Sequence, residues 1–209
     1  EVDCVLRGEG EESFPLWLDV WNVPEAWTAI PGLCYIYKDV YHDQGLSRVV
    51  DFASLKAPEE STLFTWGKPF VQVETTRGCF NTCAFCVSGV GDPIRMLPHE
   101  DIRRRLHRIR ERGIRDVRVL DRTFNYHPRH AIELLRLFEE FHPQLRFHLE
   151  VHPALLPQNV REVLSGMPHG LLHLEAGIQS LRQEVLVSAR APWAMLWTGC
   201  AFFVRSLIW

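Results

Sequence analysis

The chain has 209 residues, a length typical of one domain or of one and a half domains. Its 23 basic and 26 acidic residues give a formal net charge of −3, which excludes nucleic-acid binding held by charge alone and also excludes an acidic disordered tail. Apolar residues at 46% and charged residues at 23% are the proportions of ordinary globular domains, so we do not expect disorder.

Six cysteines in this length are too few for a disulfide scaffold, and the first residues, Glu1-Val2-Asp3, lack the features of a signal peptide. We therefore expect a cytoplasmic location, a reducing compartment in which clustered cysteines bind metal more often than they form disulfides. The sequence begins with Glu1 instead of methionine, and residues 2–6 have the pattern of a strand end. We expect this sequence to be a piece of a longer protein.

Residues 1–69 contain few long periodic stretches. Residues 14–21 favour a short helix, because the acidic residues before them would lie at its N-terminus. Residues 32–37 form an apolar and aromatic run that indicates a strand. Residues 51–65 have the composition of a connecting segment, and we predict a domain boundary near residue 70.

From residue 70 onward, strands alternate with helices whose apolar residues recur at helical spacing. This order favours right-handed βαβ units and a parallel sheet, in which the chemistry gathers at the C-terminal ends of the strands. The predicted strands are residues 70–74, 117–121, 145–151 and 171–175, and the predicted helices are residues 98–112, 128–141 and 159–165.

Three cysteines, Cys79, Cys83 and Cys86, follow the first of these strands. Thiolates are the usual ligands of iron–sulfur clusters and of zinc. No fourth cysteine lies nearby, so a cluster held here would keep one iron open to a ligand that is not protein. The alternatives are a structural zinc site completed by a histidine, of which His99 is the nearest, and three free thiols.

The Cys-x3-Cys-x2-Cys spacing, with the aromatic Phe85 directly before the third cysteine, resembles the radical S-adenosylmethionine superfamily. The resemblance covers about residues 70–190 and implies an α/β fold, a partial, truncated TIM-like barrel. It also implies an enzyme whose Cys79, Cys83 and Cys86 hold a four-iron, four-sulfur (4Fe–4S) cluster. In this family, S-adenosylmethionine binds the fourth iron and is reductively cleaved to a 5′-deoxyadenosyl radical, with electrons from a donor such as flavodoxin or ferredoxin.

The same resemblance implies further cofactor-binding residues after the later strands. The family often has a Gly-Gly-Glu stretch after the second strand; residues 120–125 lack these glycines, and Asp121 and Thr123 are the acceptors found there. Residues 149–153 resemble a Glu-x-Asn-Pro stretch of the oxygen-independent coproporphyrinogen oxidase group, which implies that Glu150 holds the adenosyl part. Gln179 lies in a stretch that resembles the Gly-Val-Gln-Ser of that group. The plainer interpretations are a solvated carboxylate at a strand end and a turn residue.

The N-terminal segment carries its own resemblance. Residues 2–11 resemble the closing strand and Gly-Glu-Gly-Glu turn of cobalamin-binding domains that precede radical S-adenosylmethionine cores. The resemblance implies that residues 1–69 are the end of a cobalamin-binding-type domain plus a linker, and that cobalamin is a cofactor of the full-length protein. The reaction would then be methyl transfer or a rearrangement on a small-molecule substrate that the sequence does not identify.

Two remaining segments bear on partners and completeness. The arginine-rich stretch at residues 103–115 favours a solvated helix face, and no nucleic-acid partner is expected. Residues 191–209 form an atypical apolar tail that is shorter than the ~20 residues of a membrane helix, so no membrane partner is expected. We expect an incomplete barrel in this chain, which puts its catalytic competence in doubt. The alternative functions are a non-catalytic iron–sulfur electron-transfer protein and a zinc-binding structural module.

Overall fold

The computed structural model describes residues 3–88 and 91–191. The predicted apolar tail lies outside the described residues except for its first residue, Ala191. The chain divides into two compact units, Glu1–Lys56 and Ala57–Trp209. This division falls before the predicted boundary near residue 70, and the assignment of residues 1–69 to a cobalamin-binding-type domain end plus a linker stays a prediction.

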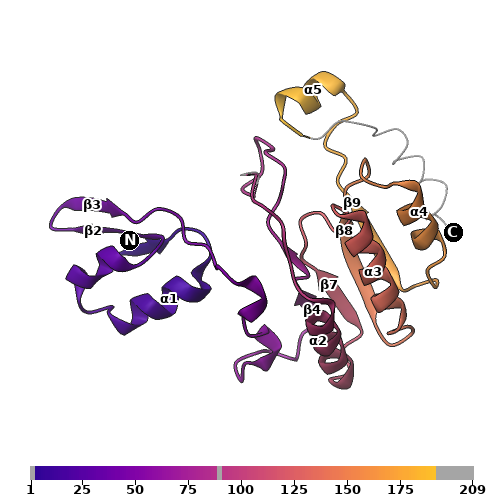
Figure 1. Cartoon of the computed structure of the whole chain (residues 1–209), viewed down its shortest axis with the longest axis horizontal. Helices are drawn as coiled ribbons and strands as arrows, with labels where there is room; N and C mark the ends of the chain where they lie inside the picture. Colours follow the sequence, from indigo (N-terminus) through magenta and orange to yellow (C-terminus); the bar gives the residue numbers. More distant parts are fainter. Residues whose placement is uncertain (1–2, 89–90, 192–209) are drawn as a thin grey trace. The chain divides into compact units, whose positions relative to one another are not determined.

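The first unit is a small antiparallel sheet with the strand order β1-β2-β3 and one α-helix (Figure 1). Its core gathers Ile30, Leu33 and Tyr35 on one side of the sheet. The predicted helix begins earlier than expected, since the acidic residues Glu11 and Glu12 form its first turn, where they favour the helix dipole. The elements are β1 (Cys4–Leu6), α1 (Gly10–Asp19), β2 (Leu33–Tyr37) and β3 (Val40–Asp43), with short 3-10 helices at Pro24–Ala29 and Phe52–Ser54.

The second unit confirms the predicted α/β fold: four parallel strands in the order β4-β7-β8-β9, joined by helices (Figure 1). The predicted strands and helices all form, with ends that shift by one or two residues. The strands are β4 (Phe70–Val73), β7 (Asp116–Val119), β8 (Arg146–Val151) and β9 (Leu172–Ala176); the helices are α2 (His99–Glu111), α3 (Pro128–Glu139), α4 (Gln158–Ser165) and α5 (Gln183–Ser188). A 3-10 helix at Pro58–Glu60 precedes them, and a two-stranded ladder of β5 (Thr76–Arg77) and β6 (Arg95–Met96) lies between β4 and α2.

The two faces of the parallel sheet differ in chemistry because alternate side chains of a strand point to opposite sides. One face packs against the helices, as the stacked rings of Phe138 on α3 and Phe147 on β8 show, with centroids 4.0 Å apart. The other face carries polar side chains at the alternate positions. The buried face consists of Val71, Val73, Val117, Val119, Phe147, Leu149 and Val151.

One arginine of the stretch at residues 103–115 departs from the expected solvated face. Arg105 is buried and donates two hydrogen bonds to the carboxylate of Glu59, at 2.8 and 3.1 Å, and a third to the carbonyl oxygen of Glu74 at 3.2 Å. It lies three residues after the buried Ile102 and four before the buried Ile109, so it shares the core-facing side of α2. Within residues 3–88 and 91–191, no helix is both long and apolar enough to cross a membrane.

Candidate active site

The cysteines lie on a loop, residues 79–88, that leaves the end of the β5-β6 ladder (the cysteine loop). In this ladder Thr76 lies opposite Met96, and Arg77 lies opposite Arg95, directly before the loop. Gly78 has a φ of +109°, and a Cβ placed there would lie 2.4 Å from the carbonyl oxygen of Pro93. Only glycine accepts both this backbone conformation and this close approach. Gly78 therefore determines where the cysteine loop begins.

A buried carboxylate holds the strand end before the loop. Asp121, which follows β7, is only 1% exposed, and its Oδ1 accepts hydrogen bonds from the backbone N–H groups of Thr75 and Thr76, both at 2.8 Å. The Thr75 hydroxyl donates to Oδ2. Burial raises the pKa of Asp121, and these hydrogen bonds oppose that effect. Asp121 thus connects the segments that follow β4 and β7, shortly before the cysteine loop begins.

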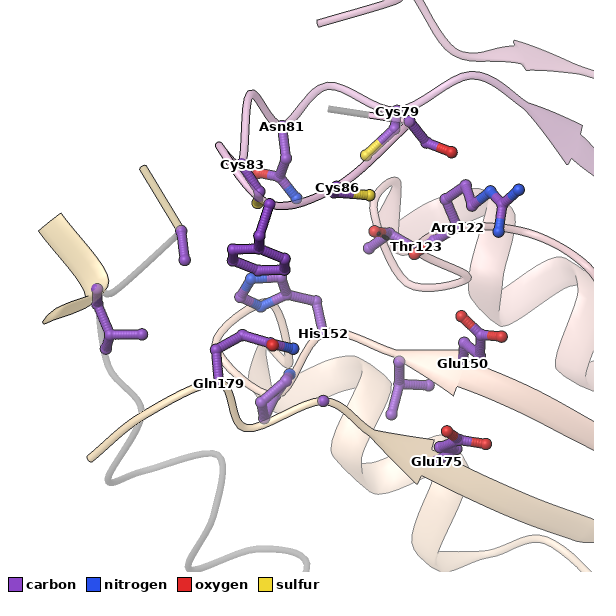
Figure 2. Close-up of a pocket in the computed structure, with 17 residues that line it drawn as sticks. Cys79, Asn81, Cys83, Cys86, Arg122, Thr123, Glu150, His152, Glu175 and Gln179 are labelled. Carbon is purple, nitrogen blue, oxygen red and sulfur yellow. Dashed lines mark hydrogen bonds between the residues drawn. The ribbon is translucent and has the colours of Figure 1, made fainter. Parts of the chain in front are cut away.

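All three cysteines line one cavity with a volume of about 330 Å³. Cys79 is buried, Cys83 is half-buried and Cys86 is exposed. Figure 2 shows the loop on one side of the cavity and the ends of β8 and β9 on the other. The sequence prediction that these cysteines share one site is thus consistent with their placement, because three sulfurs of a single loop face a common space.

The three thiols have the chemistry of metal ligands. Burial raises the pKa of the Cys83 thiol, and the neighbouring Cys79 and Cys86 raise it further, so thiolates here need a nearby positive charge. Among the described residues, no three His, Cys, Asp or Glu side chains converge as ligands of a single metal ion. A zinc ion would need its sulfurs roughly 3.8 Å apart, given a Zn–S length of about 2.3 Å in a tetrahedral site. An iron–sulfur cluster takes each thiolate on a different iron, so its sulfurs lie farther apart than those of a zinc site.

His99, the predicted fourth ligand of the zinc alternative, lies elsewhere. Its Nε2 is 2.9 Å from Nδ1 of His130 on α3, and the two rings stack with centroids 4.9 Å apart. Its other ring nitrogen, Nδ1, lies 3.5 Å from the Glu133 carboxylate. The structure therefore brings His99 into contact with α3 and does not bring it to the cysteine cavity.

Two of the three predicted cofactor-binding residues lie at the cavity. Glu150, on β8, lines it, and so does Gln179, in the loop after β9. Glu175 on β9 is the register partner of Glu150 and also lines the cavity, so two carboxylates lie side by side on neighbouring strands (Figure 2). Asp121 does not line it, because its carboxylate points into the buried contact with Thr75 and Thr76. Its expected role as a cofactor ligand has no support in its contacts.

His152, a histidine whose place next to the predicted sheet suggests that it faces the cavity, does lie at the site. His152 lines the cavity, and its Nδ1 accepts a hydrogen bond from the Ala154 N–H at 3.1 Å. The buried Asn125 clamps the same residue: its Oδ1 accepts from the His152 N–H at 2.7 Å, and its Nδ2 donates to the His152 carbonyl at 2.9 Å. Burial lowers the pKa of His152, which favours a neutral ring with Nε2–H as the donor. Its place directly after a parallel strand was the sequence signal for it.

The fold and the site define a class of protein. The sequence model of the radical SAM superfamily matches residues 73–196, more than half of the chain, and the chain belongs to this superfamily of enzymes.

Particular relatives are named as methyl-transferring enzymes. The chain is 29% identical over 150 residues to an uncharacterized methyltransferase of Pyrococcus horikoshii, an alignment covering 66% of this chain and 32% of the relative. It is 28% identical over 203 residues to the hopanoid C-3 methylase of Methylococcus capsulatus, covering 88% and 38%. The chain therefore spans about a third of the length of these curated relatives.

Solved structures share the fold. The radical S-adenosylmethionine methyltransferase TsrM of Kitasatospora setae, solved with cobalamin and a [4Fe-4S] cluster bound, aligns with a TM-score of 0.68 at 16% identity, over 92% of this chain and 41% of that one. The cobalamin-dependent S-adenosylmethionine radical enzyme OxsB aligns with a TM-score of 0.70 at 15% identity, over 91% and 30%. At such identities these likenesses show the fold alone.

Proposed function

We propose that this chain holds a 4Fe–4S cluster through Cys79, Cys83 and Cys86 and positions S-adenosylmethionine for reductive cleavage. The observation that carries the proposal is the single cavity that the three thiols share with Glu150 and Gln179, at the C-terminal ends of parallel strands. When bound, the cluster supplies one electron, received from a donor of the flavodoxin or ferredoxin type, and S-adenosylmethionine supplies the 5′-deoxyadenosyl radical.

The chain's own residues bind and orient the cofactors. Gly78 and the Thr75–Asp121 contact fix the start of the cysteine loop. Glu150 is a carboxylate acceptor for ribose hydroxyls, and Gln179 offers an amide that both donates and accepts. The apolar residues Val151 and Leu186 also line the cavity and limit the access of water to it.

We further propose that the full-length protein transfers a methyl group with the help of cobalamin. The relatives named methyltransferase and methylase and the fold shared with cobalamin-dependent enzymes support this reaction over a rearrangement. Residues 1–69 would then be the end of the cobalamin-binding-type domain plus a linker. The substrate is a small molecule that enters from the open side of the cavity.

Anaerobic reconstitution with iron and sulfide tests the proposal. We expect about four irons per chain, an electron paramagnetic resonance signal of the reduced cluster that changes when S-adenosylmethionine is added, and formation of 5′-deoxyadenosine under reduction. A cluster whose signal ignores S-adenosylmethionine would instead support a non-catalytic electron-transfer protein. A colourless protein with one tightly bound zinc would support the structural zinc module.

A further inference from the structure

The polar face of the parallel sheet carries a row of side chains that the proposed cofactor site does not use. Gln72, Arg118, His148 and His173 are register partners on the four neighbouring strands, so they form one row across the sheet (the polar row). With strands about 4.8 Å apart, the row is roughly 14 Å long. Arg118, His148 and His173 line a second cavity of about 490 Å³, at the N-terminal ends of the four strands.

A row of this composition is unusual for its position. The strands of a parallel sheet are ordinarily buried on both faces, and the layers inside a β/α barrel are mostly branched apolar side chains. Here the corresponding layer has an arginine, two histidines and a glutamine, and Gln72, Arg118 and His173 are exposed. Burying such groups under an apolar cover is unfavourable because they would lose hydrogen bonds to water. The row therefore fits a polar occupant.

The charges around the row indicate which polar groups fit it. Two of the neighbouring carboxylates have partners: Asp116 pairs with Arg146 at 2.8 Å, and Glu175 pairs with His148 at 2.9 Å. Arg118 makes no ion pair within the described part of the chain, and its guanidinium lies 3.8 Å from the centroid of the Phe70 ring. A ring against the face of the guanidinium leaves its N–H edge to bind a ligand.

The row also lies at a useful distance from the cysteine cavity. His148 is followed on β8 by Glu150, and directly after the strand by His152; both line that cavity, and each step of two residues covers about 6.6 Å. His148 bonds Glu175, a residue of the cysteine cavity, so the two cavities adjoin along the sheet. A molecule about 7–13 Å long would reach from the level of the polar row to the cysteine cavity.

We propose that the polar row binds an anionic group, a carboxylate or a phosphate, of the substrate, with Arg118 as the bidentate donor and His173 as a second donor. This inference rests on the proposed function, since it names the substrate class of the same enzyme. The substrate is a polar small molecule with its reacting carbon about 7–13 Å from its anionic end. A hopanoid-like hydrocarbon would leave Arg118 and the His173 imidazole without polar partners, so the substrate class differs from the one in the methylase relative's name.

Anion titration of the whole, metal-free chain tests the row independently of the cluster. Nuclear magnetic resonance would record the histidine imidazole signals while inorganic phosphate is added in one arm and acetate in the other, at constant pH and ionic strength. The variants His148→Asn and His173→Asn identify which signals belong to these two residues. We expect millimolar amounts of at least one anion to shift the His148 and His173 signals in preference to the other histidine signals. The arm with the tighter binding distinguishes phosphate from carboxylate.

The variant Arg118→Gln should raise the apparent Kd for the anion at least tenfold, which corresponds to about 1.4 kcal/mol. The matched control Arg104→Gln, on the exposed side of α2, should leave it unchanged. Arg118→Lys keeps the positive charge but loses the bidentate guanidinium, so its apparent Kd should lie between those of the wild type and Arg118→Gln. It also tests the proposal if the glutamine variant does not fold. No shift with either anion at 50 mM, or equal binding by the wild type and Arg118→Gln, would overturn the proposal, while loss of S-adenosylmethionine cleavage alone would not.

Discussion

The cysteine loop and the buried polar groups that follow the strands are built in opposite ways. The loop contains neither helix nor strand, and its Phe85 and Val87 are 58% and 97% exposed. By contrast, Asp121 and Asn125 are each only 1% exposed, and every side-chain oxygen of the two accepts a hydrogen bond from the backbone or from Thr75. We call Asp121 and Asn125 the polar anchors.

This difference separates binding from positioning. A loop with few internal bonds can fold around a metal centre, and the free energy of metal binding then becomes folding free energy of the loop. The polar anchors, in contrast, position the strand ends from which the loops start, and they do so with or without a metal centre. Removing a ligand should therefore change metal content and spare the fold, and removing an anchor should change the fold.

The largest expected effect is the loss of the cluster in Cys83→Ala. The thiolate is a ligand in the proposed centre, so iron content and the visible absorbance after reconstitution should fall several-fold. The free energy of unfolding of the metal-free chain should change by less than about 1 kcal/mol, since Cys83 is only half-buried. Cys4→Ala in the first unit is the matched control and should keep the full cluster. A complete, stable cluster in Cys83→Ala would contradict the ligand assignment.

The next effect is on stability, in Asp121→Ala. The variant leaves the buried N–H groups of Thr75 and Thr76 without acceptors, which should lower the free energy of unfolding by about 3 kcal/mol in a urea titration. Asp116→Ala is the control: its partner Arg146 is exposed, so the change should stay below about 1 kcal/mol. If the free energy of unfolding falls equally in both variants, the buried hydrogen bonds of Asp121 contribute no more than the exposed ion pair of Asp116.

The same division explains what the sequence predicts. The parallel strands, the three main helices and the cysteine loop all follow from local signals: period, glycine and proline positions, and the spacing of one residue type. Glu150 and Gln179 reach the cavity because they follow or end strands of a parallel sheet, so a topological rule places them. For these residues, the nearby sequence is enough to predict their place in the fold.

The positioning residues depend on contacts between distant parts of the sequence. Asp121 binds Thr75 across 46 positions, and Arg105 binds Glu59 across the same separation. The helical spacing of Arg105 from Ile102 and Ile109 signals a core-facing position, but no local pattern identifies its partner. Asp121 has the residue type and place of a cofactor ligand, and only the fold shows that its carboxylate points to the backbone instead. Long-range side-chain pairing is the part that local patterns leave open.

The smallest expected effect is a dependence of stability on pH. His130, at the start of α3, touches His99 at the start of α2, so it belongs to the framework that follows both anchored loops. Burial, together with nearby His99 and His127, lowers the pKa of His130 from 6.5 to about 4, with Glu133 opposing these effects. A folded pKa below the unfolded one gives stability that is full above pH 6.5 and is lost as pH falls toward 4.

We therefore expect the wild type to lose about 2 kcal/mol between pH 7 and pH 5 through His130. The buried His152 adds a loss of the same sign, so the measurement compares urea titrations of the wild type and His130→Asn at both pH values. The variant should lose about 2 kcal/mol less over this interval, while His169→Asn, an exposed change, should match the wild type. Equal losses in the wild type and His130→Asn would mean that His130 titrates normally and that acid weakens the framework elsewhere.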